Sequence, residues 1–567
     1  MRLVAFDSCA QLFADLRRAA KASVGPYGLP GTGFAYEQAV GGGARTMADA
    51  AGALPATAPE FSSTNVHEQG ADEPDLIKTD GRRIVTVSQG VLRVVDAATR
   101  RQTGQVNLGV GPVGQLLLSG DSALVLAPPD YRSFGLKERL PQIDGPRIML
   151  IDLTGAPKVV STYRGDGELV DARMTGSTVR VVLRSTARIN FRESAAGDTD
   201  QKRIADHRST IDDAPDSAWL PRWEVTDRTG TAKGQVDCGR VSRPTDYSGG
   251  TMVSVLTFDL TRPALGSGDA VAVAADSKQV YATPDSLYLA NDDSWLSDRP
   301  GRQAQLRRQT ELFKFALAGN QPPAYRASGT VPGYLLNQYA VSEWDGHLRV
   351  ATTDPATNSS AVRVLADRDG KLVQTGIVAG LGKGEQIFSV RFIGARGYVV
   401  TFRQTDPLYS LDLSDPAKPA VTGELKINGY SAHLQPVGEN RLIGIGQEGN
   451  DQGVRQGLQI SLFDVADPAR PQRIAQHHLP GTYSTAEYDP HALLWWPATQ
   501  LLVVPVQSRG ALTLRVTDDL KPGEELNQPA LLRSLVIGNE LWTLSKAGLR
   551  AANLSTMDQV AWVPLEG

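Results

Sequence analysis

The sequence has few of the features that bind metals through sulfur, span membranes or attract nucleic acids. Its 567 residues include two cysteines, too few for a zinc site built mainly on thiolates. No apolar run approaches the roughly 18 residues that a membrane-spanning helix needs. The formal net charge of −4 is small for this length and gives no electrostatic reason to expect nucleic acid. We therefore predict no nucleic-acid partner, no transmembrane segment and a monomer.

The two cysteines, Cys9 and Cys238, allow two interpretations. They are either unrelated buried thiols or one disulfide that ties the N-terminal segment to a long loop. The disulfide would make sense only outside the cytoplasm, where oxidising conditions preserve it. Sequence alone does not settle the pairing.

Catalytic and cofactor-binding motifs are absent or stand in the wrong context. Gly444–Gly449 matches the dinucleotide fingerprint, but a loop follows it where a helix is needed. Gly380–Gly384 has no Ser or Thr after its lysine, and Gly429–His433 lacks the second glycine of a nucleophile elbow. The seven histidines form no HExxH motif. We therefore assign no catalytic residue, no metal ligand and no cofactor.

The chain divides into three parts. Residues 1–30 show helical spacing of apolar residues, and a Gly/Pro-rich stretch then stops the helix. Residues 31–61 are rich in Gly, Ala and Pro, which is typical of a linker. From residue 62 to 567 short alternating strands are separated by turn residues, and a unit recurs.

The recurring unit contains about four strands, and its third strand often ends in an apolar residue followed by Asp. Ile148–Asp152, Leu408–Asp412 and Ile460–Asp464 are examples. Two of these strands precede near-identical turns, at 414–419 and 466–471, which indicates internal duplication. The units begin near the following positions: Asp75, Leu116, Val170, Val280, Tyr339, Ser389, His433, Glu487 and Arg533.

Four strands in each unit of roughly 45–60 residues predict antiparallel blades, and closing the array into a ring hides the strand edges. Eight or nine units can be counted. We predict an all-β fold, a β-propeller of about eight four-stranded blades, with seven to nine possible. A short helix and a linker precede it.

One polar excursion, at about 184–248, interrupts the repeat and contains Cys238. Long insertions between strands often carry recognition. Trp219 and Trp223 within it are candidates for a surface that binds a partner. The alternative is that the loop packs down and buries them.

Several long segments carry a family resemblance: Ser63–Gly81, Val331–Tyr339, Glu343–Thr353, Val390–Phe392, Tyr398–Leu408, Arg533–Gly538 and Leu541–Ser545. They resemble a secreted bacterial and archaeal family whose β-propeller is distantly related to WD repeats. The resemblance implies the propeller and a place outside the cytoplasm, secreted or lipid-anchored to the cell envelope. It implies no specific biochemical function.

Members of that family commonly carry a signal or lipoprotein leader. Met1–Asp7 has no sustained apolar core, and Cys9 lacks the apolar segment of a lipoprotein cleavage site. The resemblance therefore implies that a leader is missing from this chain. Taken at face value, the same terminus predicts a cytoplasmic protein.

The fold predicts one constellation of polar residues, because innermost strands line the central channel of a propeller. The candidates are Asp75, Lys78, Arg173, Glu343, Arg391, His433, Asp489, His491 and Arg533. Brought together, they would bind a small anion, a metal ion or water. The alternative is a set of salt bridges between neighbouring blades.

Three functions follow from these observations. The leading hypothesis is a rigid extracytoplasmic platform that binds or scaffolds protein or polysaccharide in the cell envelope. The second is an enzyme, a metal-assisted hydrolase or isomerase that uses the channel residues. The third is a WD-like assembly scaffold in the cytoplasm.

Overall fold

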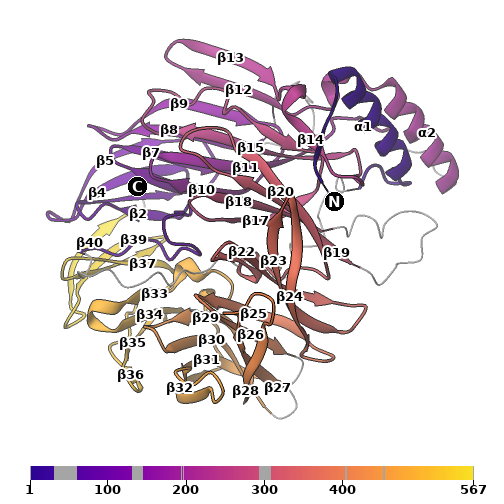
Figure 1. The fold of residues 1–567 in the computed structure, drawn as a ribbon. Helices are drawn as coiled ribbons and strands as arrows, with labels where there is room; N and C mark the ends of the chain where they lie inside the picture. The colour runs from indigo at the N-terminus through magenta and orange to yellow at the C-terminus, as the bar shows by residue number, and fades with distance from the viewer. Residues whose placement is uncertain are drawn as a thin grey trace.

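The computed structural model describes residues 2–30, 60–129, 143, 145–192, 195, 197–292, 308–402, 405–450 and 454–565. Their strands form eight sheets. The eight-stranded sheet contains two blades, joined by a parallel pair between Ser328 and Lys371. The described residues therefore form nine blades, which follow one another around a ring (Figure 1). The predicted all-β propeller is confirmed, with a blade number at the upper limit of the predicted range.

The first four blades are as follows, each from its innermost strand outward. Blade 1 is β2 (Ile77–Thr79), β3 (Arg83–Ser88), β4 (Val91–Asp96) and β5 (Arg101–Asn107). Blade 2 is β6 (Gln115–Ser119), β7 (Ser122–Ala127), β8 (Arg147–Asp152) and β9 (Lys158–Gly165). Blade 3 is β10 (Glu168–Thr175), β11 (Thr178–Thr186), β15 (Thr251–Asp259) and β16 (Val271–Val273). Blade 4 is β17 (Ser277–Ala282), β18 (Ser286–Asp292), β19 (Gln309–Ala316) and β20 (Ala324–Pro332).

The remaining five blades follow in the same order. Blade 5 is β21 (Val341–Trp344), β22 (His347–Asp354), β23 (Ser359–Arg368) and β24 (Lys371–Leu381). Blade 6 is β25 (Gln386–Ile393), β26 (Arg396–Phe402), β27 (Thr405–Asp412) and β28 (Ala420–Asn428). Blade 7 is β29 (Tyr430–Pro436), β30 (Arg441–Gly449), β31 (Arg455–Asp464) and β32 (Gln472–Pro480). Blade 8 is β33 (Leu494–Trp496), β34 (Leu501–Val506), β35 (Gly510–Val516) and β36 (Leu520–Pro522), and blade 9 is β37 (Leu531–Ile537), β38 (Glu540–Ser545), β39 (Gly548–Asn553) and β40 (Gln559–Pro564).

The predicted unit starts lie at or near the innermost strands, except at Glu487. Two short 3₁₀ turns, Thr485–Glu487 and Pro490–Ala492, come between that position and β33. This connection and the long excursion in blade 3 make the spacing of the units irregular. The nine predicted starts nevertheless correspond to the nine blades, so the preferred number of eight is one too low.

The recurring Asp at the end of the third strand has a local structural role. In each case its carboxylate accepts a hydrogen bond from the backbone N–H two residues later. The distances are 2.9 Å at Asp152, 3.0 Å at Asp259, 2.9 Å at Asp412 and 2.9 Å at Asp464. Such a bond closes the turn that leads into the fourth strand.

A proline at the end of that turn packs against a glycine of the preceding blade. A Cβ on Gly104 of blade 1 would lie 2.4 Å from Cδ of Pro157 in blade 2. Blades 5 and 6 repeat the contact with Gly376 and Pro419, where the distance is also 2.4 Å. Only a residue without a side chain allows this approach. The proline that ends each of these turns therefore requires a glycine at the facing position of the preceding blade.

The first and last blades close the ring. Ile77, Ile84 and Val95 of blade 1 form one buried cluster with Trp542 and Leu549 of blade 9. Each blade comes from one continuous part of the chain, so closure depends on this packing and on residues 60–62, which pair with β37. Figure 1 shows the two ends of the propeller side by side.

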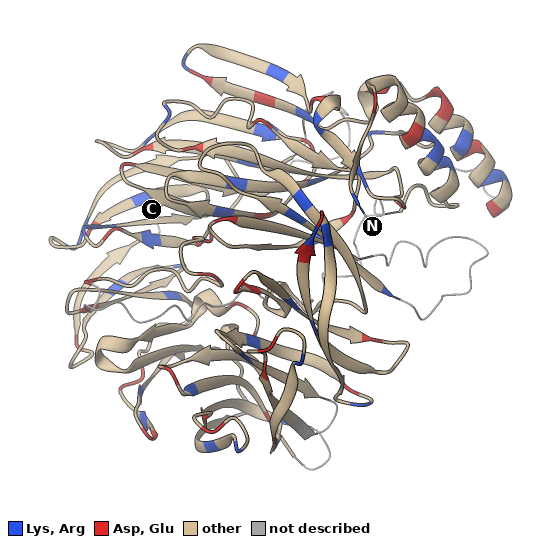
Figure 2. Ribbon diagram, in the orientation of Figure 1, with Lys and Arg blue, Asp and Glu red and all other residues tan. Residues whose placement is uncertain are grey.

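The excursion extends blades 2 and 3 at their outer edges. The hairpin β12 (Arg222–Asp227) and β13 (Gly230–Gln235) continues blade 2, while β14 (Val241–Arg243) and β1 (Val4–Ala5) continue blade 3. Helix α2 (Asp200–Asp213) packs against α1 (Cys9–Ser23), the helix predicted within residues 1–30. Both helices carry charges of both signs (Figure 2).

A disulfide joins Cys9 of α1 to Cys238 of the excursion, which is the second of the two interpretations of the cysteines. Ser8 caps α1 by accepting a hydrogen bond from the N–H of Gln11 at 3.2 Å. Leu12 and Leu16 of the helix are buried against the excursion. The N-terminal helix is thus fastened to the outer edge of blade 3. Most of the predicted linker, 31–59, lies outside the described residues.

We expect Gly104→Ala to destabilise the propeller, because the new methyl group would collide with Pro157. Overpacking of this kind costs about 1–3 kcal/mol. Thermal unfolding followed by circular dichroism measures the loss. Gly155→Ala is the matched control, because a Cβ at Gly155 meets nothing within 4 Å. Equal effects of the two changes would contradict the contact, and Pro157→Ala should partly restore the stability of Gly104→Ala.

Candidate functional site

The central channel is crossed by the protein's own chain. We call residues 60–76, which precede the first strand of blade 1, the plug segment. Its backbone pairs with the innermost strands of three blades: Phe61 with Ile537, Asp72 with Met174 and Asp75 with Leu116. Its side chains reach others, since the amide of Asn65 donates to Gln435 Oε1 at 3.1 Å and His67 Nε2 lies 3.0 Å from the carbonyl oxygen of Val341. The channel is therefore filled by polypeptide that connects blades far apart in the sequence.

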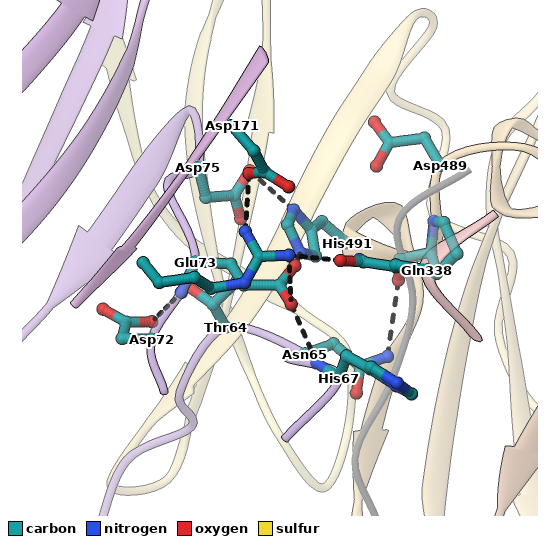
Figure 3. A network of polar contacts seen from close by, with 12 residues as sticks. Thr64, Asn65, His67, Asp72, Glu73, Asp75, Asp171, Gln338, Asp489 and His491 are labelled. Carbon is teal, nitrogen blue, oxygen red and sulfur yellow. Dashed lines mark hydrogen bonds and ion pairs between the residues drawn. The ribbon is translucent and has the colours of Figure 1, made fainter. Parts of the chain in front are cut away.

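Glu73 of the plug segment is the centre of a buried polar network (Figure 3). Its side chain is 0% exposed. One carboxylate oxygen lies 3.4 Å from an Arg173 guanidinium nitrogen and accepts the backbone N–H of His67 at 3.1 Å. The other lies 3.1 Å from Nε2 of His491. One carboxylate thus connects blade 3, the plug segment and the entry to blade 8.

Arg173 extends the network in two directions. Its guanidinium donates to Asp171 Oδ1 at 2.5 Å and to the backbone carbonyl of Ala172 at 2.7 Å. It also donates to the side-chain oxygen of Gln338, which precedes β21. Blade 3 is thereby linked across the channel to blade 5.

A second ion pair joins the plug segment to blade 9. Arg533 Nε donates to Asp75 Oδ1 at 2.5 Å, and an Arg533 terminal nitrogen lies 2.8 Å from Asp489 Oδ2. Lys78 Nζ donates to Thr64 Oγ1 at 2.6 Å, Asp72 Oδ1 at 2.7 Å and the Glu73 carbonyl oxygen at 2.6 Å. Opposite charges are therefore paired throughout this network.

Burial and partners act in opposite directions on the pKa values of this network. Burial would raise the pKa of Glu73, but Arg173 and His491 outweigh it and hold that pKa well below its usual range. Burial opposes the charged form of His491, yet its hydrogen bond to Glu73 and the nearby Asp75 raise its pKa above 6.5. His67 is different, because burial and the positive charge of Arg391 lower its pKa to about 3. Its ring is neutral, and its Nε2–H donates to Val341.

The other predicted channel residues lie in two neighbouring clusters. Glu343 accepts from Lys314 Nζ at 2.7 Å, and its backbone N–H donates to the Tyr281 hydroxyl at 2.6 Å. That hydroxyl in turn donates to Glu68 of the plug segment at 2.7 Å. Arg391 and His433 are buried and line a cavity of about 10 Å³, the space of one water molecule.

The structure brings Asp75, Lys78, Arg173, Asp489, His491 and Arg533 together and places Glu343, Arg391 and His433 nearby. Four further residues of the channel were not predicted from the sequence: Glu73, Asp171, Gln338 and His67. Glu73 and His67 lie in the motif Ser63–Gly81, so the motif was the available signal. The part of the motif before Asp75 precedes the first repeat unit, so its residues were not expected inside the channel.

Trp219 and Trp223, the predicted surface residues, pack instead. Trp219 is 4% exposed in the cluster between α1 and the excursion, with the Arg17 guanidinium over its ring. Trp223 is half-buried, and its Nε1–H donates to the carbonyl of Gln235 at 3.2 Å. The loop therefore packs down on the propeller, which was the alternative interpretation of the sequence.

A cavity of about 1030 Å³ opens at one face of the channel. The plug segment forms its floor. Its wall comes from the ends of innermost strands, including Leu118 of β6, Ile393 of β25, Pro436 of β29 and Leu494 of β33. It is larger than most pockets for small ligands, which measure about 300–1,000 Å³.

The described part of the chain contains neither a clustered metal site nor a membrane-spanning helix. No group of three or more His, Cys, Asp or Glu side chains there is arranged to hold a metal ion. No helix among these residues is long and apolar enough to cross a membrane.

The family model described as "Beta propeller domain" matches residues 61–557. The chain belongs to this family. An uncharacterized protein of Methanocaldococcus jannaschii is 28% identical, covering 86% of this chain and 81% of that protein. An uncharacterized protein of Archaeoglobus fulgidus is 27% identical, covering 90% and 85%. Among solved structures, the C-terminal WD40 domain of Sif2 is similar at 10% identity and a TM-score of 0.35, covering 81% of this chain and 99% of that one.

We expect Glu73→Gln to lower the stability of this beta propeller by about 3 kcal/mol, because it leaves Arg173 and His491 buried without their shared carboxylate. The thermal unfolding midpoint measures the loss. Glu224→Gln is the matched control: Glu224 pairs with Lys233 on the exposed hairpin β12–β13, and such surface pairs contribute about 0–1 kcal/mol. Similar losses in both variants would show that the buried network does not hold the plug segment.

His491 predicts a pH dependence of stability. Its pKa in the folded protein is raised, so its contribution is complete below the unfolded value of about 6.5 and is lost as the pH rises through the folded pKa. His491→Gln should therefore cost more stability at about pH 5.5 than at about pH 9.5. Unfolding midpoints across this range measure the difference. His67→Gln should show the opposite trend, because the pKa of His67 is lowered, and a pH-independent cost for both would contradict the assignment.

Proposed function

We propose that this protein is an extracytoplasmic binding platform whose ligand, a protein or a polysaccharide of the cell envelope, enters the cavity over the plug segment. The observation that carries the proposal is the cavity of about 1030 Å³ at the centre of a closed ring. Preformed concave sites of this kind are the usual binding sites of proteins.

The architecture supports binding by a rigid surface. Several blades contribute to the cavity wall, and its floor is fastened by two ion pairs, Lys78 with the partly exposed Asp72 and Arg533 with the buried Asp75. A ligand therefore meets groups that are already in place, which reduces the entropy cost of binding. Opposite charges in the network around Glu73 are paired with one another, so that network serves to hold the floor.

The disulfide supports the proposed location. Cys9 is exposed and Cys238 is half-buried, so the bond between them is within reach of reductants. Exposed disulfides of this kind do not persist in a reducing cytoplasm. A place outside the cytoplasm preserves the connection between α1 and the excursion.

The experiment measures both the location of the protein and the binding of its ligand in living cells of the source organism. A photo-crosslinking residue replaces Ser63, which is exposed and lines the cavity. We expect irradiation to link it to an envelope protein or polysaccharide, and we expect alkylation before lysis to find Cys9 and Cys238 oxidised. Val421, exposed on the outer strand β28, is the control position and should give no such link.

Two results would contradict the proposal. Free thiols at Cys9 and Cys238 in cells, together with recovery in the cytoplasmic fraction, would favour the cytoplasmic scaffold. Equal crosslinking from positions 63 and 421 would show that the cavity does not select a ligand.

A further inference from the structure

The cavity wall includes apolar residues from four different blades. Leu118, Met174, Ile393 and Leu535 lie at or near the ends of the innermost strands β6, β10, β25 and β37. We call these four residues the apolar collar. Leu118 and Ile393 are half-buried, so part of their surface remains for a ligand. Met174 and Leu535 are buried in clusters between blades, so a ligand meets the collar mainly at Leu118 and Ile393.

Some charged groups of the same cavity have a partner of opposite charge, and others have none. Lys78 is paired with Asp72, and Asp75 is paired with Arg533. Glu60 and Glu439 also line the cavity, are exposed, and form no ion pair among the described residues. The mouth therefore carries two uncompensated carboxylates, which favour a ligand with a positive charge.

The plug segment shows which kind of molecule the innermost strands accept. Its backbone hydrogen-bonds to them, as when the N–H of Asp72 donates to the Met174 carbonyl at 2.7 Å and that of Asp75 to Leu116 at 3.0 Å. The strands β25, β29 and β33 have a partner on one side only within the described residues, and their ends line the cavity. Only the cavity ends of these strands, such as Ile393, Pro436 and Leu494, can meet an extended chain in the same way.

The tryptophans of the cavity argue against a sugar ligand. Recognition of a sugar ring by stacking needs an exposed aromatic face. Trp496 is 4% exposed, and Trp495 packs against the cluster between blades 7 and 8. The aliphatic collar suits side chains of Val, Leu or Ile better than it suits hydroxyl-rich rings.

We propose that the cavity binds an extended polypeptide segment that carries apolar side chains and at least one Lys or Arg. The apolar side chains contact the collar, the basic residue pairs with Glu60 or Glu439, and the backbone contacts the cavity ends of β25, β29 and β33. This inference rests on the proposed binding function and names its ligand class.

The test uses the full folded chain and a phage-displayed library of random dodecapeptides. We expect selection to enrich sequences that alternate apolar residues and contain Lys or Arg. Fluorescence anisotropy of a labelled synthetic copy then measures affinity. Replacing its basic residue by Glu should weaken binding about tenfold, because that change turns one attraction into a repulsion.

Variants of the cavity locate the peptide. Glu439→Gln should weaken binding about threefold, the effect of one exposed ion pair. Ile393→Ser should weaken it about tenfold by removing apolar contact. Val421→Ser is the matched control in the same blade, because Val421 is 44% exposed on the outer strand, and it should leave affinity unchanged. Leu118→Ser replaces Ile393→Ser if the latter lowers the unfolding midpoint.

The outcomes separate this inference from the proposed function. No enrichment, or peptides whose affinity ignores every cavity variant, would overturn the polypeptide class. Binding of dextran, tested as a neutral polysaccharide probe and weakened by Ile393→Ser, would also overturn it while supporting the platform. The platform itself fails only on the crosslinking and thiol results from cells.

Discussion

The carboxylate of Glu73 holds the centre of the molecule together. It is completely buried, and it contacts Arg173 of blade 3, His491 before blade 8 and the backbone of His67. A charge in such a place is tolerated only when its partners replace the lost water. The rest of the channel follows from this requirement, because each partner is held in turn by Asp171, Gln338 or Asp75.

The plug segment distinguishes blades that are otherwise built alike. Nine blades of similar construction could slide or swap neighbours, since each contacts mainly the next one. The plug segment connects blades 2, 3, 5, 7 and 9 through backbone and side-chain contacts. It also converts an open pore into a cavity with a floor. Architecture and proposed function thus depend on the same short stretch of chain.

The propeller itself was predictable from the sequence, because its determinants are local. The terminal Asp of the third strand, the proline turns and the alternating strands each act within one blade or between neighbours, so they repeat visibly. The charged candidates Arg173, His491 and Arg533 were also found, since they sit in or just before innermost strands. Glu73 was not, because its role depends on contacts with residues 100 to more than 400 positions away. The burial of Trp219 was equally unpredictable, since α1, which covers it, lies far earlier in the sequence.

The central claim is that the plug segment is an integral part of the ring, and amide hydrogen exchange tests it most directly. The backbone N–H groups of Ser62, His67, Asp72 and Asp75 are all hydrogen-bonded inside the channel. They should exchange as slowly as those of the innermost strands β6 and β10. Exchange as fast as that of the exposed turn at Gly155 would contradict the account, because the segment would then lie in the channel without being held there.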